Sequence, residues 1–402
     1  MTIPDPMSNH TTTVPPLFSM MLGLGLAGCS STERTASTDG STLFTGDAPV
    51  TFTEVQDRDP LPGDITLEEW TVLADAGDPE AQFLMGTFHE EGRGVDADDS
   101  IAFDWYAKSS EQGFAPAQNN LGMMYYEGRG TDIDHDKALG CFQNAAERGH
   151  AGAENNLGVM YLVGAGCDAD DETAAKWFER SADKGNARAQ RMMGTLCFEG
   201  RGTNKDDEAS ARWLRLAADQ GDASAQTSLA LMYYDGVGVT QDHDVAAEWL
   251  TLASGNGCHE AEFMLGWMHL EGVAFEQDLD RAATLIGRSA DAGTPIAQAT
   301  YGMMYHEGIG VDKNFAEAAR YLQYAADHGV ASAQNNLAVL YLRGDGVPQD
   351  RTLATMWLRS AADQGLTIAA ERLQMLQDVD QSPTVETGSS VATVGIGDID
   401  AR

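Results

Sequence analysis

The chain has 402 residues, of which 43% are hydrophobic and 22% are charged, so it can bury a substantial core and is not a membrane protein with many spans. It carries 25 Lys and Arg residues against 62 Asp and Glu residues, which gives a formal net charge of −37. A surface this acidic repels phosphate backbones, and nucleic acids are therefore not expected among its partners.

The N-terminal region contains an apolar stretch from Leu17 to Leu26 that leads directly to Cys29. The Leu-Ala-Gly-Cys box at 26–29 resembles the end of a bacterial lipoprotein signal peptide, although residues 1–28 contain no Lys or Arg. The resemblance implies a signal peptide over 1–28 and a lipidated Cys29. The protein is then expected in the cell envelope, on the outer-membrane or periplasmic side, with the lipid as its only contact with the membrane. If Cys29 is not processed, a secreted or cytoplasmic protein is the alternative.

The next segment is rich in Ser, Thr, Gly, Asp and Pro, which predicts a flexible tether over 29–64. A first helix is then expected near 66–76, because Thr66 and Glu69 have the spacing of a capping box. Trp70 and Leu73 would face the interior.

A repeat of 36 residues occupies the centre of the chain. Glycine recurs at nine positions that are each 36 residues apart: 77, 113, 149, 185, 221, 257, 293, 329 and 365. Alanine recurs with the same spacing from 81 to 369. Residues 77–364 therefore form eight units without an insertion or deletion, and such a period predicts a stacked repeat array.

Each unit has two apolar stripes at helical spacing, near 79–91 and 99–112 in the first unit. Glycine ends both helices, because it accepts the left-handed conformation of a helix C-cap. A good N-cap residue precedes every second helix: Asp98, Asp134, Asp170, Asp206, Asp242, Asp278, Asn314 and Asp350. A lone helix near 366–376 ends the array, so the repeat domain spans 65–376, and a disordered tail is expected over 377–402.

The second unit reads Ala117-Gln118-Asn119-Asn120-Leu121-Gly122-Met123-Met124-Tyr125-Tyr126-Glu127-Gly128-Arg129-Gly130. This pattern resembles the Sel1-like repeat, a relative of the tetratricopeptide repeat. The resemblance implies an all-α fold, a right-handed α-solenoid of eight helix-turn-helix repeats with a capping helix at each end. It also implies a non-enzymatic scaffold for other proteins. Local departures are Ala230 and Ala338 at a small-Gly position, Ala274 at a loop Gly, and Cys141 and Leu285 at an aromatic position.

Tetratricopeptide-like stacking implies that three columns of the first helices face the concave side of the array. These columns stand two residues before, two after and five after the motif Leu. Their side chains are the predicted groove for partner proteins, with basic segments favoured by the acidic surface. The groove residues are Asn119, Met123, Tyr126, Asn155, Phe198, Tyr234, Phe263, Trp267, Met303, His306 and Asn335. The alternative is that these columns are buried against neighbouring helices.

No pattern in the sequence predicts catalysis, a metal site or a bound cofactor. The histidines and cysteines lack metal-ligand spacing, and the Gly-x-Gly loops follow helices without a Gly-Lys-Ser/Thr. Some cysteine-rich Sel1-like proteins are linked to β-lactam binding. Here Cys141, Cys167, Cys197 and Cys258 occupy four different repeat positions, so mostly buried, unpaired thiols are expected. A β-lactam-binding or hydrolysing protein and a structural cell-wall tether remain the alternative functions.

Overall fold

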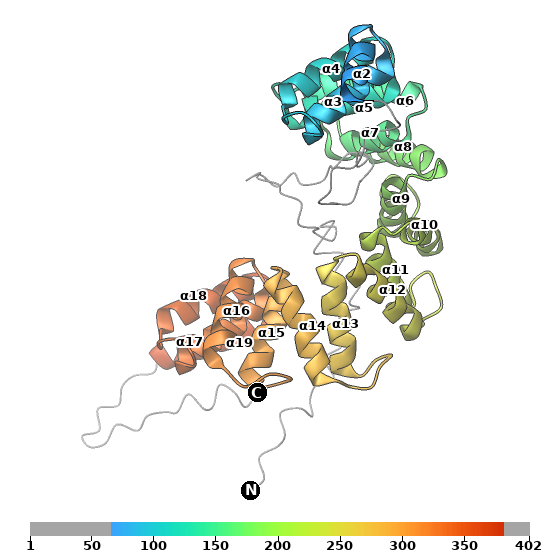
Figure 1. Ribbon diagram of the computed structural model, residues 1–402. Coiled ribbons are helices and arrows are strands. Elements are labelled where there is room, and N and C mark those ends of the chain that lie inside the picture. Colours follow the sequence, from blue (N-terminus) through green and yellow to red (C-terminus); the bar gives the residue numbers. More distant parts are fainter. Residues whose placement is uncertain (1–65, 382–402) are drawn as a thin grey trace, which may run out of the picture. The chain divides into compact units, whose positions relative to one another are not determined.

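The computed structural model describes residues 66–381, which form helices and no strand (Figure 1). The helices are α2 (Leu67–Asp75), α3 (Pro79–Glu91), α4 (Asp99–Glu111), α5 (Ala115–Glu127), α6 (His135–Glu147), α7 (Ala151–Val163), α8 (Asp171–Asp183), α9 (Ala187–Glu199), α10 (Asp207–Asp219), α11 (Ala223–Asp235), α12 (His243–Gly255), α13 (His259–Glu271), α14 (Leu279–Asp291), α15 (Pro295–Glu307), α16 (Phe315–Asp327), α17 (Ala331–Arg343), α18 (Arg351–Asp363) and α19 (Thr367–Gln381). The predicted all-α array of two helices per 36 residues is confirmed. The last helix runs five residues beyond its predicted end at Leu376.

The described residues form two compact units, 66–241 with α2 to α11 and 242–381 with α12 to α19. Within each unit, every helix packs against the helix that follows it in the chain. The stability of such an array is approximately the sum of its repeats and their nearest-neighbour interfaces. Packing between consecutive helices therefore decides where each side chain lies.

The second helix of every repeat begins at the residue that the sequence predicts. All eight predicted N-cap side chains accept hydrogen bonds from backbone N–H groups of the first turn. At Asp170, hydrogen bonds from Thr173 hold the pKa of the carboxyl below its usual value. Seven of the chain's 62 acidic residues thus serve as N-caps of the second helices.

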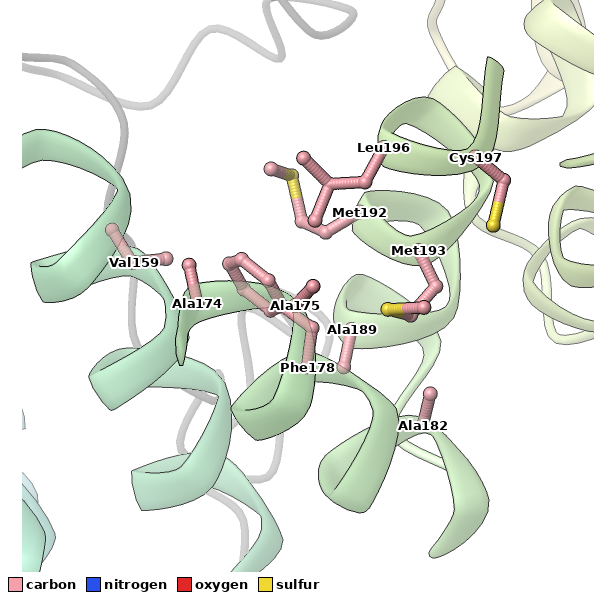
Figure 2. Packing of buried hydrophobic residues seen from close by; sticks show 10 residues of the cluster. All are labelled: Val159, Ala174, Ala175, Phe178, Ala182, Ala189, Met192, Met193, Leu196 and Cys197. Carbon is pink, nitrogen blue, oxygen red and sulfur yellow. The ribbon is translucent and has the colours of Figure 1, made fainter. Parts of the chain in front are cut away.

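Small residues on the first helix let the second helix of the same repeat approach closely. A Cβ placed on Gly158 would lie 2.8 Å from the ring of Phe178, and five other repeats have a glycine in the same role. Phe178 is fully buried in a cluster formed by residues of α7, α8 and α9 (Figure 2). One aromatic ring therefore packs against two successive repeats at once.

In six of the Gly-x-Gly loops, the second glycine closely approaches the backbone of the preceding repeat. A Cβ on Gly166 would lie 2.6 Å from the carbonyl oxygen of His135, at the start of the preceding repeat's second helix. Gly130, Gly202, Gly238, Gly310 and Gly346 approach the equivalent carbonyl, always 31 residues earlier, at least as closely. These glycines also have positive φ values between 65° and 72°. No other residue type meets both conditions without strain.

Ala274 occupies this loop position in the sixth repeat. It is the one non-glycine residue with a positive φ, 60°, among residues 66–381. Alanine in the left-handed region costs roughly 1 kcal/mol, so this loop carries a local strain that the other loops lack.

We predict opposite effects for two exchanges at this loop position. Ala274→Gly should raise the free energy of unfolding by about 1 kcal/mol, because it relieves the backbone strain. Gly130→Ala should lower it by about 2–4 kcal/mol, because the added Cβ meets a backbone carbonyl that cannot move aside. Urea denaturation followed by circular dichroism measures both changes.

Gly185→Ala is the matched control, because Gly185 also has a positive φ, 90°, but no atom within 4 Å of an added Cβ. Gly185→Ala should lower the free energy of unfolding only by the cost of placing alanine at a positive φ. Equal losses in Gly130→Ala and Gly185→Ala would show that the loop contact does not limit the approach of the repeats.

A column of buried amides joins each first helix to the helix before it. The side-chain Nε2 of six glutamines donates to the carbonyl oxygen of the residue eight positions earlier, at 3.0–3.4 Å. The donors are Gln82, Gln118, Gln190, Gln226, Gln298 and Gln334. Each bond adds a second donor to a carbonyl near the end of the preceding helix, which also accepts from the backbone N–H of the glycine three residues later.

Two repeats replace this glutamine with a buried glutamate. The side chain of Glu154 is fully buried, and its two carboxylate oxygens lie 2.7 Å from Arg180 Nη2 and 2.7 Å from Lys184 Nζ. Glu262 is likewise buried and forms an ion pair with Arg288, and its Oε2 lies 3.0 Å from Nδ1 of His259. The exchange of an amide for a carboxylate is therefore accompanied by cations within the same repeat.

Removing both cations from Glu154, in the variant Arg180→Ala/Lys184→Ala, should lower the free energy of unfolding by about 3 kcal/mol or more. Adding Glu154→Gln to this variant should recover part of the loss, because glutamine is the residue that six other repeats bury there. The measurement is urea denaturation of the three proteins. Lys176→Ala, which breaks an exposed ion pair with Glu172, serves as the control and should cost at most about 0.5 kcal/mol. A triple variant no more stable than the double variant would contradict the interpretation.

Candidate partner-binding face

The eleven predicted groove residues all lie on first helices, six in the first unit and five in the second. Asn119, Met123 and Tyr126 are on α5, Asn155 is on α7, Phe198 on α9 and Tyr234 on α11; Phe263 and Trp267 are on α13, Met303 and His306 on α15, and Asn335 on α17. Their burial divides them into two groups.

Five of them are buried and present almost no surface. Asn119, Met123, Asn155, Phe263 and Asn335 are 2–6% exposed. Four of these belong to the column two residues before the motif Leu. The residues of this column that were predicted to line the groove are buried by packing instead. This outcome is the alternative that the sequence left open.

Two of these three buried asparagines, Asn119 and Asn335, accept hydrogen bonds from the first helix or capping helix that follows. Asn156 Nδ2 donates to Asn119 Oδ1 at 3.0 Å, and Arg372 Nη1 donates to Asn335 Oδ1 at 2.8 Å. In both pairs, the donor stands 37 residues after the acceptor. The amides of Asn119 and Asn335 are therefore engaged within the array, although the sequence places both residues in the predicted groove for partner proteins.

The other six side chains are half-buried: Tyr126, Phe198, Tyr234, Trp267, Met303 and His306. Tyr126 and Trp267 each have an aromatic neighbour in their own repeat. The ring centroid of Tyr126 lies 4.9 Å from that of His135, and that of Trp267 lies 6.4 Å from that of Phe263. These six side chains, from the columns two and five residues after the motif Leu, form a partly exposed, mainly apolar surface, which we call the groove face.

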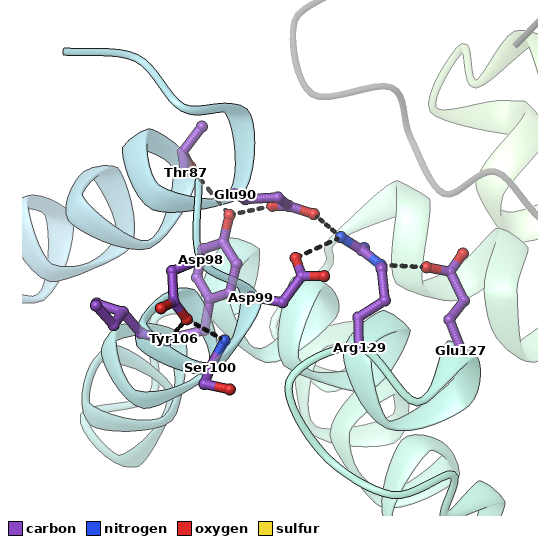
Figure 3. A network of polar contacts seen from close by, with 9 residues as sticks. Thr87, Glu90, Asp98, Asp99, Ser100, Tyr106, Glu127 and Arg129 are labelled. Carbon is purple, nitrogen blue, oxygen red and sulfur yellow. Dashed lines mark hydrogen bonds and ion pairs between the residues drawn. The ribbon is translucent and has the colours of Figure 1, made fainter. Parts of the chain in front are cut away.

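A polar network at the first repeats was not foreseen. Tyr106 donates its hydroxyl hydrogen to Glu90 at 2.6 Å, and Glu90 Oε1 lies 2.5 Å from Nη1 of Arg129, in the next repeat (Figure 3). Burial and the Glu90 carboxylate raise the pKa of Tyr106 above its usual range, so its hydroxyl stays protonated and can donate. Glu90 belongs to the same column as Tyr126, so the network closes the first-repeat end of the groove face.

Arg129 also approaches Asp99 of the preceding repeat, with 3.7 Å between nitrogen and oxygen. The equivalent pair two repeats later is Arg201 with Asp171, at 2.8 Å. Arginine in the Gly-Arg-Gly loop and aspartate 30 residues earlier is a signal that the sequence contains, and it marks an ion pair between neighbouring repeats.

Within residues 66–381, no group of three or more His, Cys, Asp or Glu side chains is arranged to hold a metal ion. Cys141, Cys167 and Cys197 carry free thiols, of which only Cys197 is buried. Burial raises the pKa of Cys141 to about 11, so this thiol is a poor nucleophile at neutral pH.

No helix in this part of the chain is long and apolar enough to cross a membrane. Cys29, the predicted signal peptide, the tether over 29–64 and most of the predicted tail lie outside the described residues.

Comparison with known proteins identifies the repeat. The Sel1 repeat profile matches eight consecutive segments from 79–114 to 331–366, in the period that the sequence predicts. A Sel1 repeat protein from Oxalobacter formigenes is 34% identical over 78% of this chain and 91% of its own, with a TM-score of 0.57. A protective antigen of uropathogenic Escherichia coli strains, described as having an SLR fold, is 30% identical over 78% and 75%, with a TM-score of 0.55. A comparison with curated proteins gave no match. The chain belongs to the Sel1 repeat family.

Proposed function

We propose that this protein is a non-enzymatic scaffold that binds segments of other proteins on its groove face, and that a lipid on Cys29 holds it in the bacterial cell envelope. Sel1 repeat proteins are generally scaffolds for protein interactions. The observation that carries the proposal is the groove face itself. Half-buried aromatic, Met and His side chains recur along successive first helices, while the neighbouring polar column is engaged within the array.

The composition of the groove face fits protein recognition. Trp and Tyr are over-represented among the residues that dominate binding energy, and Met adapts to irregular partner surfaces. Trp267 and Tyr234 are the largest half-buried side chains of the groove face, one in each unit. The net charge of −37 additionally attracts basic segments at long range and speeds their encounter, an effect that salt screens.

Truncating a binding anchor typically costs at least about 2 kcal/mol, or roughly a thirtyfold loss of affinity. We therefore expect Trp267→Ala and Tyr234→Ala each to lose most of the partner captured by affinity purification from crosslinked cells. Both variants should keep a helical spectrum and a cooperative thermal melt.

Tyr324→Ala is the matched control, because Tyr324 is 47% exposed on the second helix α16 and lies outside the groove face. It should capture partner as the wild type does. If both groove variants captured partner as the wild type does, the groove face would not be the binding surface. If a variant lost both partner capture and its cooperative thermal melt, the residue would be needed for packing of the array.

The lipid anchor rests on the Leu-Ala-Gly-Cys box at 26–29. We expect metabolic labelling with a fatty-acid probe to mark the wild-type protein and to be lost in Cys29→Ala. Cys167→Ala, which removes a free thiol of the repeat array, should keep the label. Equal labelling of Cys29→Ala, or no labelling of the wild type, would exclude the anchor without affecting the groove face.

A further inference from the structure

The last repeats contain a small cavity on the groove face of the second unit. It has a volume of about 180 Å³ and lies between first helices of consecutive repeats. Its lining includes Met303 and His306 from α15, Val339 and Arg343 from α17, and Arg372 from α19. Met303 and His306 are predicted groove residues, whereas the two arginines are not among the residues that the sequence predicts for the groove.

Arg372 is only partly satisfied by the protein. Its Nη1 donates to Asn335, but its Nε is buried without a hydrogen-bond partner, and Arg372 makes no ion pair within the described residues. Burial and the nearby charge of Arg343 lower the pKa of the Arg372 guanidinium. Two like charges thus face one cavity in a chain that has only 25 Lys and Arg residues.

The cavity has one acidic side chain, Glu307, whose Oε1 lies 2.6 Å from Nδ1 of the neighbouring His306. Its remaining lining includes Met303, Val339 and Leu340, which are apolar. Small-molecule sites usually measure about 300–1,000 Å³. A cavity of 180 Å³ is therefore better matched to one side chain of a docked segment than to a separate ligand.

We propose that this cavity binds the carboxylate of an Asp or Glu side chain in a partner segment whose flanking residues are apolar. The proposal rests on the function proposed above and adds the chemistry of the partner at this end of the groove face. Guanidinium groups match carboxylates in geometry, and charge-assisted bonds are stronger than neutral ones. Glu307 disfavours a phosphate, because it repels a dianion more strongly than a carboxylate. The acidic surface attracts basic residues in general, whereas this cavity selects a local acidic one.

The test uses the full chain and three peptides that differ in one residue. Acetylated Gly-Ser-Leu-Glu-Leu-Ser-Gly, its Gln analogue and its phosphoserine analogue each carry a neutral dye, and anisotropy reports binding. The Glu peptide should bind roughly tenfold more tightly than the Gln peptide. Arg372→Gln and Arg343→Gln should each remove most of this preference.

Arg359→Gln is the matched control, since Arg359 is an exposed arginine of the same unit that does not line the cavity. It should keep the preference for the Glu peptide. Thermal melts confirm that each variant is folded, and Arg343, which is exposed, is the safer of the two cavity variants.

Equal binding of the Glu and Gln peptides, no binding of any peptide, or a stronger response to the phosphoserine peptide would overturn the proposal. So would an unchanged preference in Arg343→Gln and Arg372→Gln. None of these outcomes bears on capture through Trp267 and Tyr234, which is scored separately in the affinity purification.

Discussion

Six of the eight repeats meet the preceding repeat through a backbone approach that leaves no room for a side chain. The loop glycine of one repeat lies against the carbonyl at the start of the previous second helix, and this contact recurs in six loops. Because each helix packs mainly against its neighbours in the chain, the spacing of the first helices depends on this approach. The distance between groove side chains of successive repeats is therefore fixed by glycine rather than by the groove residues themselves.

That spacing also determines how polar groups are used. Acidic side chains cap helices or pair across repeat boundaries, as Asp170 and Asp171 illustrate in adjacent positions. Asparagines bridge first helices. What remains exposed along the groove face is mainly apolar, with a positive cavity near Arg372. The chemistry of the proposed recognition surface is therefore not described by the overall composition of this very acidic chain.

The sequence predicted the helices and their N-caps because both depend on residues close together in the chain. Asp98 caps a helix that begins at the next residue, and Gly92 ends one that closes at the preceding residue. Which of the groove columns are buried was harder to predict from the sequence. Asn119 meets a residue 37 positions later, one more than the repeat, and only the twist between helices brings the two together. The period alone assigns Asn119 and Tyr126 to one face, whereas packing buries the first and leaves the second half-exposed.

The buried glutamates have a consequence for how this array can change over generations. Glu154 and both of its cations lie inside the repeat 151–186, and Glu262 and its partners lie inside 259–294. Duplication or deletion of such a repeat carries the charge and its compensation together. The ion pair of Arg201 with Asp171 instead joins two neighbouring repeats. Deletion of one of these repeats would leave the other residue without its ion-pair partner. The array can therefore lengthen or shorten most easily by duplication or deletion of repeats in which each buried charge has its ion-pair partner within the same repeat.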